Sequence, residues 1–176
     1  DGTDGYSGVW MELNSTNMGV SVGSGWGGGP GQRRSKIASH GKQPGELVTV
    51  TAVVSGATDM SLYLDGVDVG GTYSGYGNTT FVDNGLDAVI GRYTASSGPL
   101  VNQLVYRTGS TDNLHVWTKA LTAEEAATFA TTSAIGSEED LLALYTFDEG
   151  GGAVTVDDAQ GFEANLFGNP TWILEN

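Results

Sequence analysis

The sequence predicts an all-β jelly-roll sandwich of two antiparallel sheets, with one short helix near residues 122–133. Of its 176 residues, 28 are glycine and only four are proline, which is typical of many short strands joined by tight turns. Short runs of alternating apolar and polar residues recur at fairly even spacing, and turn-forming residues separate them. The length suits one domain with a substantial core, so residues 1–176 are predicted to form a single β-sandwich domain.

The first half of the chain holds the clearest strand patterns. Tyr6–Leu13 and Met18–Val22 predict paired strands joined by a turn at residues 14–17. Glu46–Ser55 carries apolar residues on both faces, which predicts a central strand. The Asp-Gly pair at residues 65–66 lies between two alternating runs and predicts a hairpin, because both turn positions need positive φ.

The second half predicts further strands and the helix. Thr122 and Glu125 have the spacing of a capping box, which places a helix start at Thr122. Residues 70–84 predict a long loop, and the basic residues at 33, 34 and 36 predict a solvated strand edge. The remaining strands are expected at residues 88–91, 103–108, 114–117, 141–147, 153–156 and 171–174.

The charge balance limits the partners of the chain. The net charge is −14, from 21 acidic residues against seven Lys and Arg, so nucleic acid would be repelled. No run of about eighteen apolar residues occurs, and we expect no membrane insertion. Cysteine is absent, which excludes a disulfide framework and favours a secreted or cell-surface bacterial protein. The chain does not begin with Met, and we expect neighbouring domains of a longer chain.

Four segments carry a family resemblance. Asp112–Glu125 joins an acid-led strand to the capped helix, Ser61–Gly70 contains the Asp-Gly hairpin, Leu141–Gly152 contains Tyr-Thr-Phe-Asp-Glu-Gly, and Asp158–Leu166 is an Asp-x-x-Gly turn followed by Ala-Asn-Leu. Together they resemble the laminin-G-like domains of the concanavalin-A-like lectin and glucanase superfamily. In that family the last two segments open the domain, whereas here they close the chain. We therefore expect a circularly permuted or split domain.

The resemblance implies a calcium site. The family's leading Asp corresponds to Asp112, which would lie near Asp157 and Asp158, with carbonyls around Gly161 and Phe162 completing the shell. Calcium prefers six to eight oxygen ligands held by loops, and the segment from Val156 to Gly161 has that character. The alternative is that these acids only cap turns, which is a common role of Asp.

Aromatic residues among glycines predict a second kind of site. Trp26, Tyr73 and Tyr76 lie in Gly-rich segments, and Asn78 follows them. An exposed ring beside an amide can stack on a sugar face while hydrogen bonds fix the sugar hydroxyls. The alternative is that the rings fold back and close an end of the sandwich.

Catalysis finds no support in the sequence. Glycosidases of this fold carry two carboxylates in an E-x-D-x-x-E pattern on one strand, and the chain lacks this pattern. We therefore expect a non-catalytic, calcium-containing recognition module of a secreted or surface protein, such as a bacterial adhesin, that binds carbohydrate or cell-surface glycan. The alternatives are a calcium-binding spacer that presents a neighbouring ligand-binding domain, and an accessory domain of a polysaccharide-degrading enzyme.

Overall fold

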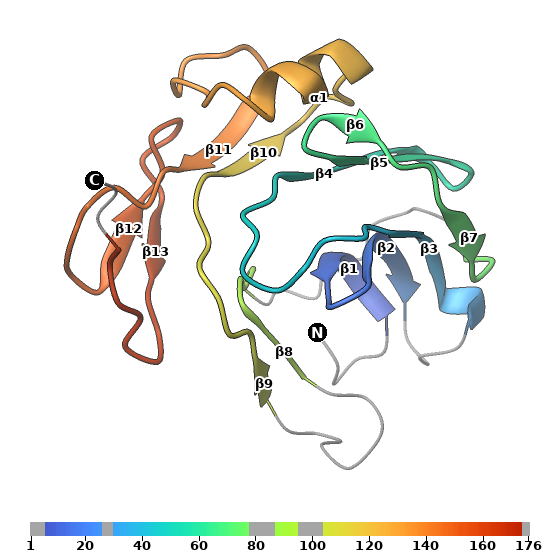
Figure 1. The fold of residues 1–176 in the computed structure, drawn as a ribbon, viewed down its shortest axis with the longest axis horizontal. Helices are drawn as coiled ribbons and strands as arrows, with labels where there is room; N and C mark the ends of the chain where they lie inside the picture. Colours follow the sequence, from blue (N-terminus) through green and yellow to red (C-terminus); the bar gives the residue numbers. More distant parts are fainter. Residues whose placement is uncertain (1–5, 26–29, 78–86, 95–103, 174–176) are drawn as a thin grey trace. The chain divides into compact units, whose positions relative to one another are not determined.

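The structure, a computed structural model, describes residues 6–25, 30–77, 87–94 and 104–173. Antiparallel strands dominate these residues, and α1 (Ala123–Phe129) is short, which confirms the predicted all-β class with one short helix (Figure 1). The chain divides into two compact units, residues 1–109 and 110–176. The interpretation of residues 1–176 as a single domain stays a prediction.

The first unit contains two sheets that face each other. One has the strand order β1-β2-β3-β7 and the other β4-β5-β6, while β8 and β9 form a separate ladder. The register is antiparallel throughout, with Val9 opposite Val22 and Val50 opposite Leu64. The bounds are β1 Tyr6–Leu13, β2 Asn17–Gly25, β3 Arg33–Ser39, β4 Val50–Gly56, β5 Asp59–Leu64, β6 Val67–Asp68, β7 Thr72–Ser74, β8 Arg92–Thr94 and β9 Leu104–Tyr106, with a 3-10 turn η1 at Pro30–Gln32.

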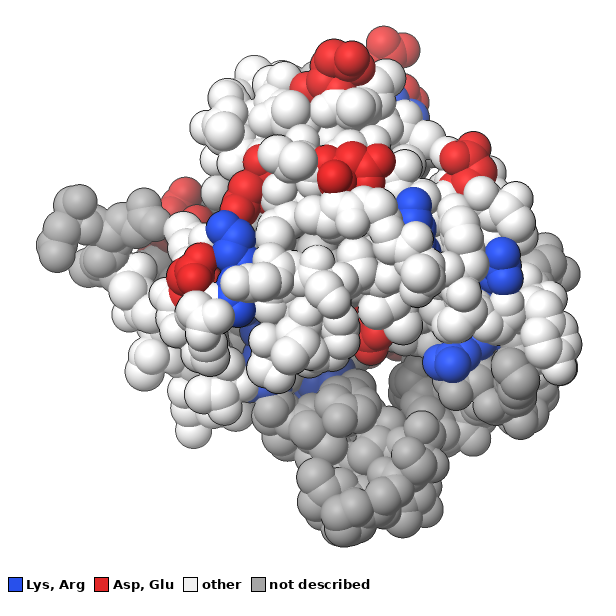
Figure 2. Space-filling model, turned by 45° about the vertical axis from the view of Figure 1, so that its right-hand side comes forward, with Lys and Arg blue, Asp and Glu red and all other residues white. Residues whose placement is uncertain are grey.

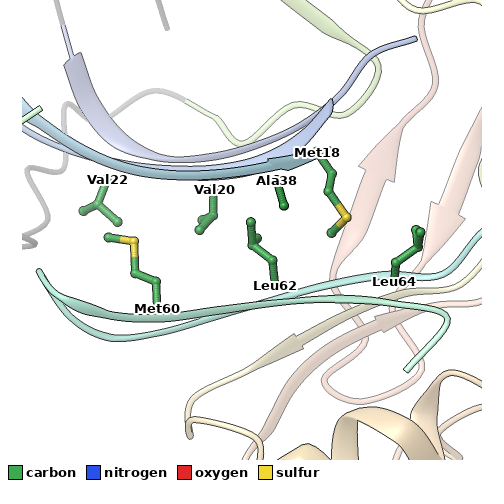
Figure 3. Packing of buried hydrophobic residues seen from close by; sticks show 7 residues of the cluster. All are labelled: Met18, Val20, Val22, Ala38, Met60, Leu62 and Leu64. Atoms are coloured by element: carbon green, nitrogen blue, oxygen red, sulfur yellow. The ribbon is translucent and has the colours of Figure 1, made fainter. Parts of the chain in front are cut away.

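The core of this unit lies between its two sheets. Every second residue of β2 and of β5 points into it, as the two-residue period of a strand requires. Figure 3 shows the side chains of β2 and β3 meeting those of β5 across the interface. The buried cluster consists of Met18, Val20, Val22, Ala38, Met60, Leu62 and Leu64.

The basic residues of β3 correct one prediction. β3 lies between β2 and β7 in the sheet, so these residues do not form a solvated edge. The Arg34 Nε donates a hydrogen bond of 2.7 Å to the Ala57 carbonyl, and the Lys36 Nζ donates one of 2.6 Å to the Met60 carbonyl. The prediction was wrong because both acceptors belong to segments more than twenty residues away, and local sequence does not reveal them.

The position of β4 corrects the prediction that residues 46–55 form a central strand. β4 is the end strand of the three-stranded sheet among the described residues, and not a central one. Both faces of this sheet are nevertheless buried, because Val53 and Tyr63 point away from Leu62 and are only 9% and 6% exposed. Apolar residues on both faces of a strand therefore indicate that both faces of its sheet are covered. They do not indicate that the strand has a neighbouring strand on each side.

The loop predicted at residues 70–84 also contains β7, and β8 begins just after the predicted strand at 88–91.

The second unit contains two short ladders and the helix. β10 (Leu114–Trp117) pairs with β11 (Leu141–Tyr145), and β12 (Val154–Val156) pairs with β13 (Glu163–Asn165). Its small core is made of Ala134, Leu141 and Leu144, against which Trp117, Phe129 and Ala159 pack. Residues 171–173 do not form the predicted strand.

The helix confirms its predicted start but not its predicted end. The Thr122 Oγ1 accepts a hydrogen bond of 3.2 Å from the Glu125 amide, and a Glu125 carboxylate oxygen accepts one of 2.8 Å from the Thr122 amide. The helix ends at Phe129 rather than at residue 133, because two threonines and a serine follow and the Thr131 hydroxyl donates to the Thr128 carbonyl. Among the described residues no helix has both the length and the apolar character that a membrane span requires.

Candidate metal and ligand sites

Asp157 anchors the turn that follows β12. Its side chain is only 1% exposed, and its Oδ1 accepts hydrogen bonds from the amides of Leu144 and Ala159. Its Oδ2 accepts a third, of 2.8 Å, from the Gln160 amide. Burial raises the pKa of Asp157, but these amides outweigh burial and hold the pKa below its ordinary value. A charged carboxylate thus connects the turn to β11.

Asp158 follows β12, and Asp112 precedes β10. The exposed carboxylate of Asp158 accepts a hydrogen bond of 3.2 Å from the Thr146 hydroxyl, just after β11. The β10–β11 ladder pairs Leu114 with Tyr145, and Asp112 precedes this pair by two residues. Asp112 is also exposed. Both carboxylates therefore belong to the same end of the β10–β11 ladder.

The backbone of the same turn supplies the other predicted ligands. Gly161 has φ +79° and donates its amide to the Asp157 carbonyl at 2.9 Å, while the Phe162 carbonyl accepts from the Asp157 amide at 2.8 Å. A carbonyl oxygen has two lone pairs, so Phe162 keeps one for an ion, whereas backbone amides already satisfy the Asp157 carboxylate. No group of three or more acidic or histidine side chains in the described residues is placed to hold a metal. An ion here would draw most of its ligands from carbonyls and water, which calcium accepts.

Tyr73 lies on β7 and packs on the first unit. Its hydroxyl oxygen accepts a hydrogen bond of 2.9 Å from the Met60 amide, and its ring packs against the core cluster. The Arg34 guanidinium lies 4.7 Å from the centre of the ring. This placement matches the alternative in which a ring closes the sandwich, and a sugar-stacking role for Tyr73 stays a prediction.

Tyr76 differs from Tyr73 because its side chain is 78% exposed. The ring lies against Gly31 of η1, where an added Cβ would come within 3.1 Å of the Tyr76 Cε2. A glycine at residue 31 thus lets the ring approach the backbone closely. The other two predicted sugar-binding residues, Trp26 and Asn78, lie outside the described residues.

The second unit contains a depression that the sequence did not predict as a site. Its volume is about 280 Å³, and its lining includes Trp117, Lys119 and Phe129. The two rings have centroids 4.7 Å apart and planes tilted by 36°. The sequence assigned Trp117 to a strand and Glu125 to a helix cap, and only the loop at residues 134–140 brings further acids to them. The lining residues that carry a charge or an aromatic ring are Trp117, Lys119, Glu125, Phe129, Glu138 and Glu139, and together they define the Trp117 depression.

Charges in the Trp117 depression are closely coupled. The Lys119 Nζ lies 2.6 Å from the Glu125 Oε1, a hydrogen bond that raises the pKa of Lys119 and lowers the pKa of Glu125. Burial raises the pKa of Glu138, but backbone amides, first that of Ile135, lower it by more. The carboxylates of Glu125 and Glu138 are therefore ionised in neutral and mildly acidic solution.

The family model of the concanavalin A-like lectin/glucanases superfamily, Laminin_G_3, matches residues 1–127. The chain belongs to this superfamily. The matched region covers the first unit, including Tyr73 and Tyr76, and continues through Asp112 into α1. No curated protein and no solved structure gives a significant match.

Membership of this superfamily confirms the family and the sandwich fold predicted from the sequence. It also indicates the kind of function, because laminin-G-like and concanavalin-A-like domains are lectin-like modules, typically binding rather than catalytic.

Proposed function

We propose that this protein is a calcium-containing module that recognises carbohydrate on cell surfaces, and that Tyr76 is part of its sugar-binding surface. The observation that supports this best is a tyrosine ring 78% exposed on a domain of a lectin-like superfamily. Tyrosine suits a contact with a sugar because it combines an apolar ring face with a polar hydroxyl. A shallow open site of this kind binds a single sugar weakly, so adhesion would depend on many copies.

The calcium proposal is supported by the two exposed acids at one end of the β10–β11 ladder. Asp112 and Asp158 are exposed, and Asp157 holds the turn that presents Asp158 and the carbonyls of Gly161 and Phe162. In this proposal the ion fixes the turn against the ladder and has a structural role. A protein of this class would be secreted or would act at a bacterial cell surface, where calcium is abundant.

The test is a titration of glycans into variants of the chain. Tyr76→Ala should lower the affinity for a bound neutral glycan about tenfold, because stacking on an aromatic ring is lost. Phe167→Ala is the matched control, because Phe167 is an 80% exposed ring in the other unit. Equal affinities of the wild type and Tyr76→Ala would refute the role of Tyr76.

A second candidate function is a calcium-binding spacer that presents a neighbouring domain. The placement of Tyr73 favours it, since the Tyr73 hydroxyl is hydrogen-bonded to the Met60 amide and its ring lies under Arg34. The spacer predicts calcium-dependent stability without glycan binding. The same titration therefore separates the two candidates. In either case we expect no turnover of polysaccharides, which reducing-end assays on a panel of β-glucans and alginate would check.

A further inference from the structure

The Trp117 depression lies in the part of the chain with the strongest negative charge. Residues 110–176 hold 12 of the 21 acidic residues and one of the seven Lys and Arg, a formal charge of −11, which leaves −3 on residues 1–109. Figure 2 shows acidic side chains gathered over α1, beside which the depression lies. The local potential therefore attracts cations and repels glycans that carry carboxylate or sulfate groups.

The floor of the depression provides apolar surface with a fixed orientation. Trp117 comes from β10 and Phe129 from the last turn of α1, and both pack on the core of the unit. The ring of His115 meets both of them edge-on, with centroid distances of 6.4 Å and 6.0 Å. Three packed rings lose little conformational entropy when a ligand binds on them.

An ammonium group already occupies part of this surface. The Lys119 Nζ lies 5.8 Å from the centre of the Trp117 ring while it is bound to Glu125. Cation–π attraction operates at this distance. The arrangement shows that a primary ammonium group fits between an aromatic face and a carboxylate at this place in the fold.

Two further carboxylates of the depression remain for a ligand. Glu138 Oε2 is buried and has no hydrogen-bond partner among the described residues, although the Oε1 of the same group accepts from the Ile135 amide. Glu139 is exposed on the rim. A buried acceptor without a partner is unfavourable, and a turn of the Glu138 side chain toward the depression would let a donor from a ligand remove that cost.

From these contacts we propose that the Trp117 depression binds the protonated amino group of an amino sugar, as found in deacetylated glycans. The sugar ring would lie against Trp117 and Phe129, and its ammonium group would donate to Glu138 and Glu139. The volume of about 280 Å³ suits one sugar residue rather than a long chain segment. The proposal rests on the carbohydrate binding proposed above and names a ligand class for a separate site.

The experiment titrates the full chain with three probes at mildly acidic pH and follows backbone amide shifts by NMR. The probes are a glucosamine tetramer, its fully N-acetylated counterpart, and a short peptide with the same number of lysines. The glucosamine tetramer should shift the amides around Trp117 and Phe129 and bind at least about tenfold more tightly than either of the others.

Matched variants separate a site from diffuse attraction. Glu139→Gln should weaken binding of the glucosamine tetramer about tenfold, whereas Glu163→Gln should leave it unchanged, although both remove one exposed charge from the same unit. Trp117→Phe, which keeps a packed ring, should weaken binding less than Glu139→Gln does.

Three results would overturn the proposal. The first is an equal loss of affinity for the glucosamine tetramer in Glu139→Gln and Glu163→Gln. The others are binding of the N-acetylated probe as tight as that of the glucosamine tetramer, and tighter binding of the lysine peptide. Neutral glycans that bind through Tyr76 while amino sugars do not would overturn this inference alone. Absence of binding by every glycan would overturn the proposed function as well.

Discussion

Asp157→Asn tests how the turn after β12 is held. The substitution keeps the size and shape of the side chain but removes its charge and replaces one oxygen with an NH₂ group. If the amide oxygen takes the place of Oδ1, the bonds from Leu144 and Ala159 remain. The NH₂ group then faces the Gln160 amide, and two donors oppose each other where the wild type has a bond of 2.8 Å.

The cost follows from the bonds that are lost. A hydrogen bond to a charged group contributes about 1.5–3 kcal/mol, and a buried amide left without a partner costs about as much as the bond it lost. Asp157→Asn should therefore lower the free energy of unfolding by about 2–3 kcal/mol. Because the pKa of Asp157 is depressed in the folded protein, its contribution is complete above the pKa of an unfolded aspartate, about 3.9, and is lost as the pH falls further.

The assay is urea unfolding followed by circular dichroism, at neutral pH and in a series down to about pH 3. The wild type should be the more stable protein at neutral pH, and the difference should shrink on acidification below about pH 4. The difference should persist in chelator, because backbone amides and not an ion satisfy this carboxylate. A variant as stable as the wild type, or a difference that chelator abolishes, would refute the assignment.

Three other predictions concern the ion, the core and a close backbone contact. Calcium should raise the melting temperature by several degrees over chelator, and Asp112→Ala should reduce that difference, as differential scanning calorimetry would show. Leu62→Ala should cost about 2–5 kcal/mol in urea unfolding, since Leu62 is fully buried, whereas Leu47→Ala should have little effect because Leu47 is 82% exposed. Gly136→Ala should cost about 1–3 kcal/mol, because Gly136 has φ +86° and an added Cβ would lie 2.8 Å from the Asp158 carbonyl oxygen. Gly151→Ala, in open space, should be nearly neutral by the same measurement.

The features that short-range chemistry determines were predictable from the sequence. The Asp65–Gly66 turn adopts positive φ at both residues, 50° and 78°, as its Asp-Gly sequence requires. The Thr122 cap forms both of its expected hydrogen bonds. In each case the partners lie within three residues, so the local sequence contains the whole interaction.

The features that depend on distant partners were not predictable. β3 is internal because it pairs with β7 as well as with β2, and β7 lies more than thirty residues further along the chain. The Trp117 depression needs acids from α1 and from the 134–140 loop beside a ring of β10. Tyr73 and Tyr76 occur in one Gly-rich segment, but only the fold shows that the first packs on the core and the second is exposed.

A glycan-array screen of the chain, in calcium and in chelator, shows whether this protein recognises carbohydrate. We expect binding to at least one neutral or amino-bearing glycan and none to sulfated or uronate-rich glycans, because the net charge of −14 repels these anionic glycans. The chain could instead melt cooperatively and gain stability from calcium, yet bind no glycan on the array. This result would contradict carbohydrate recognition and favour the spacer function.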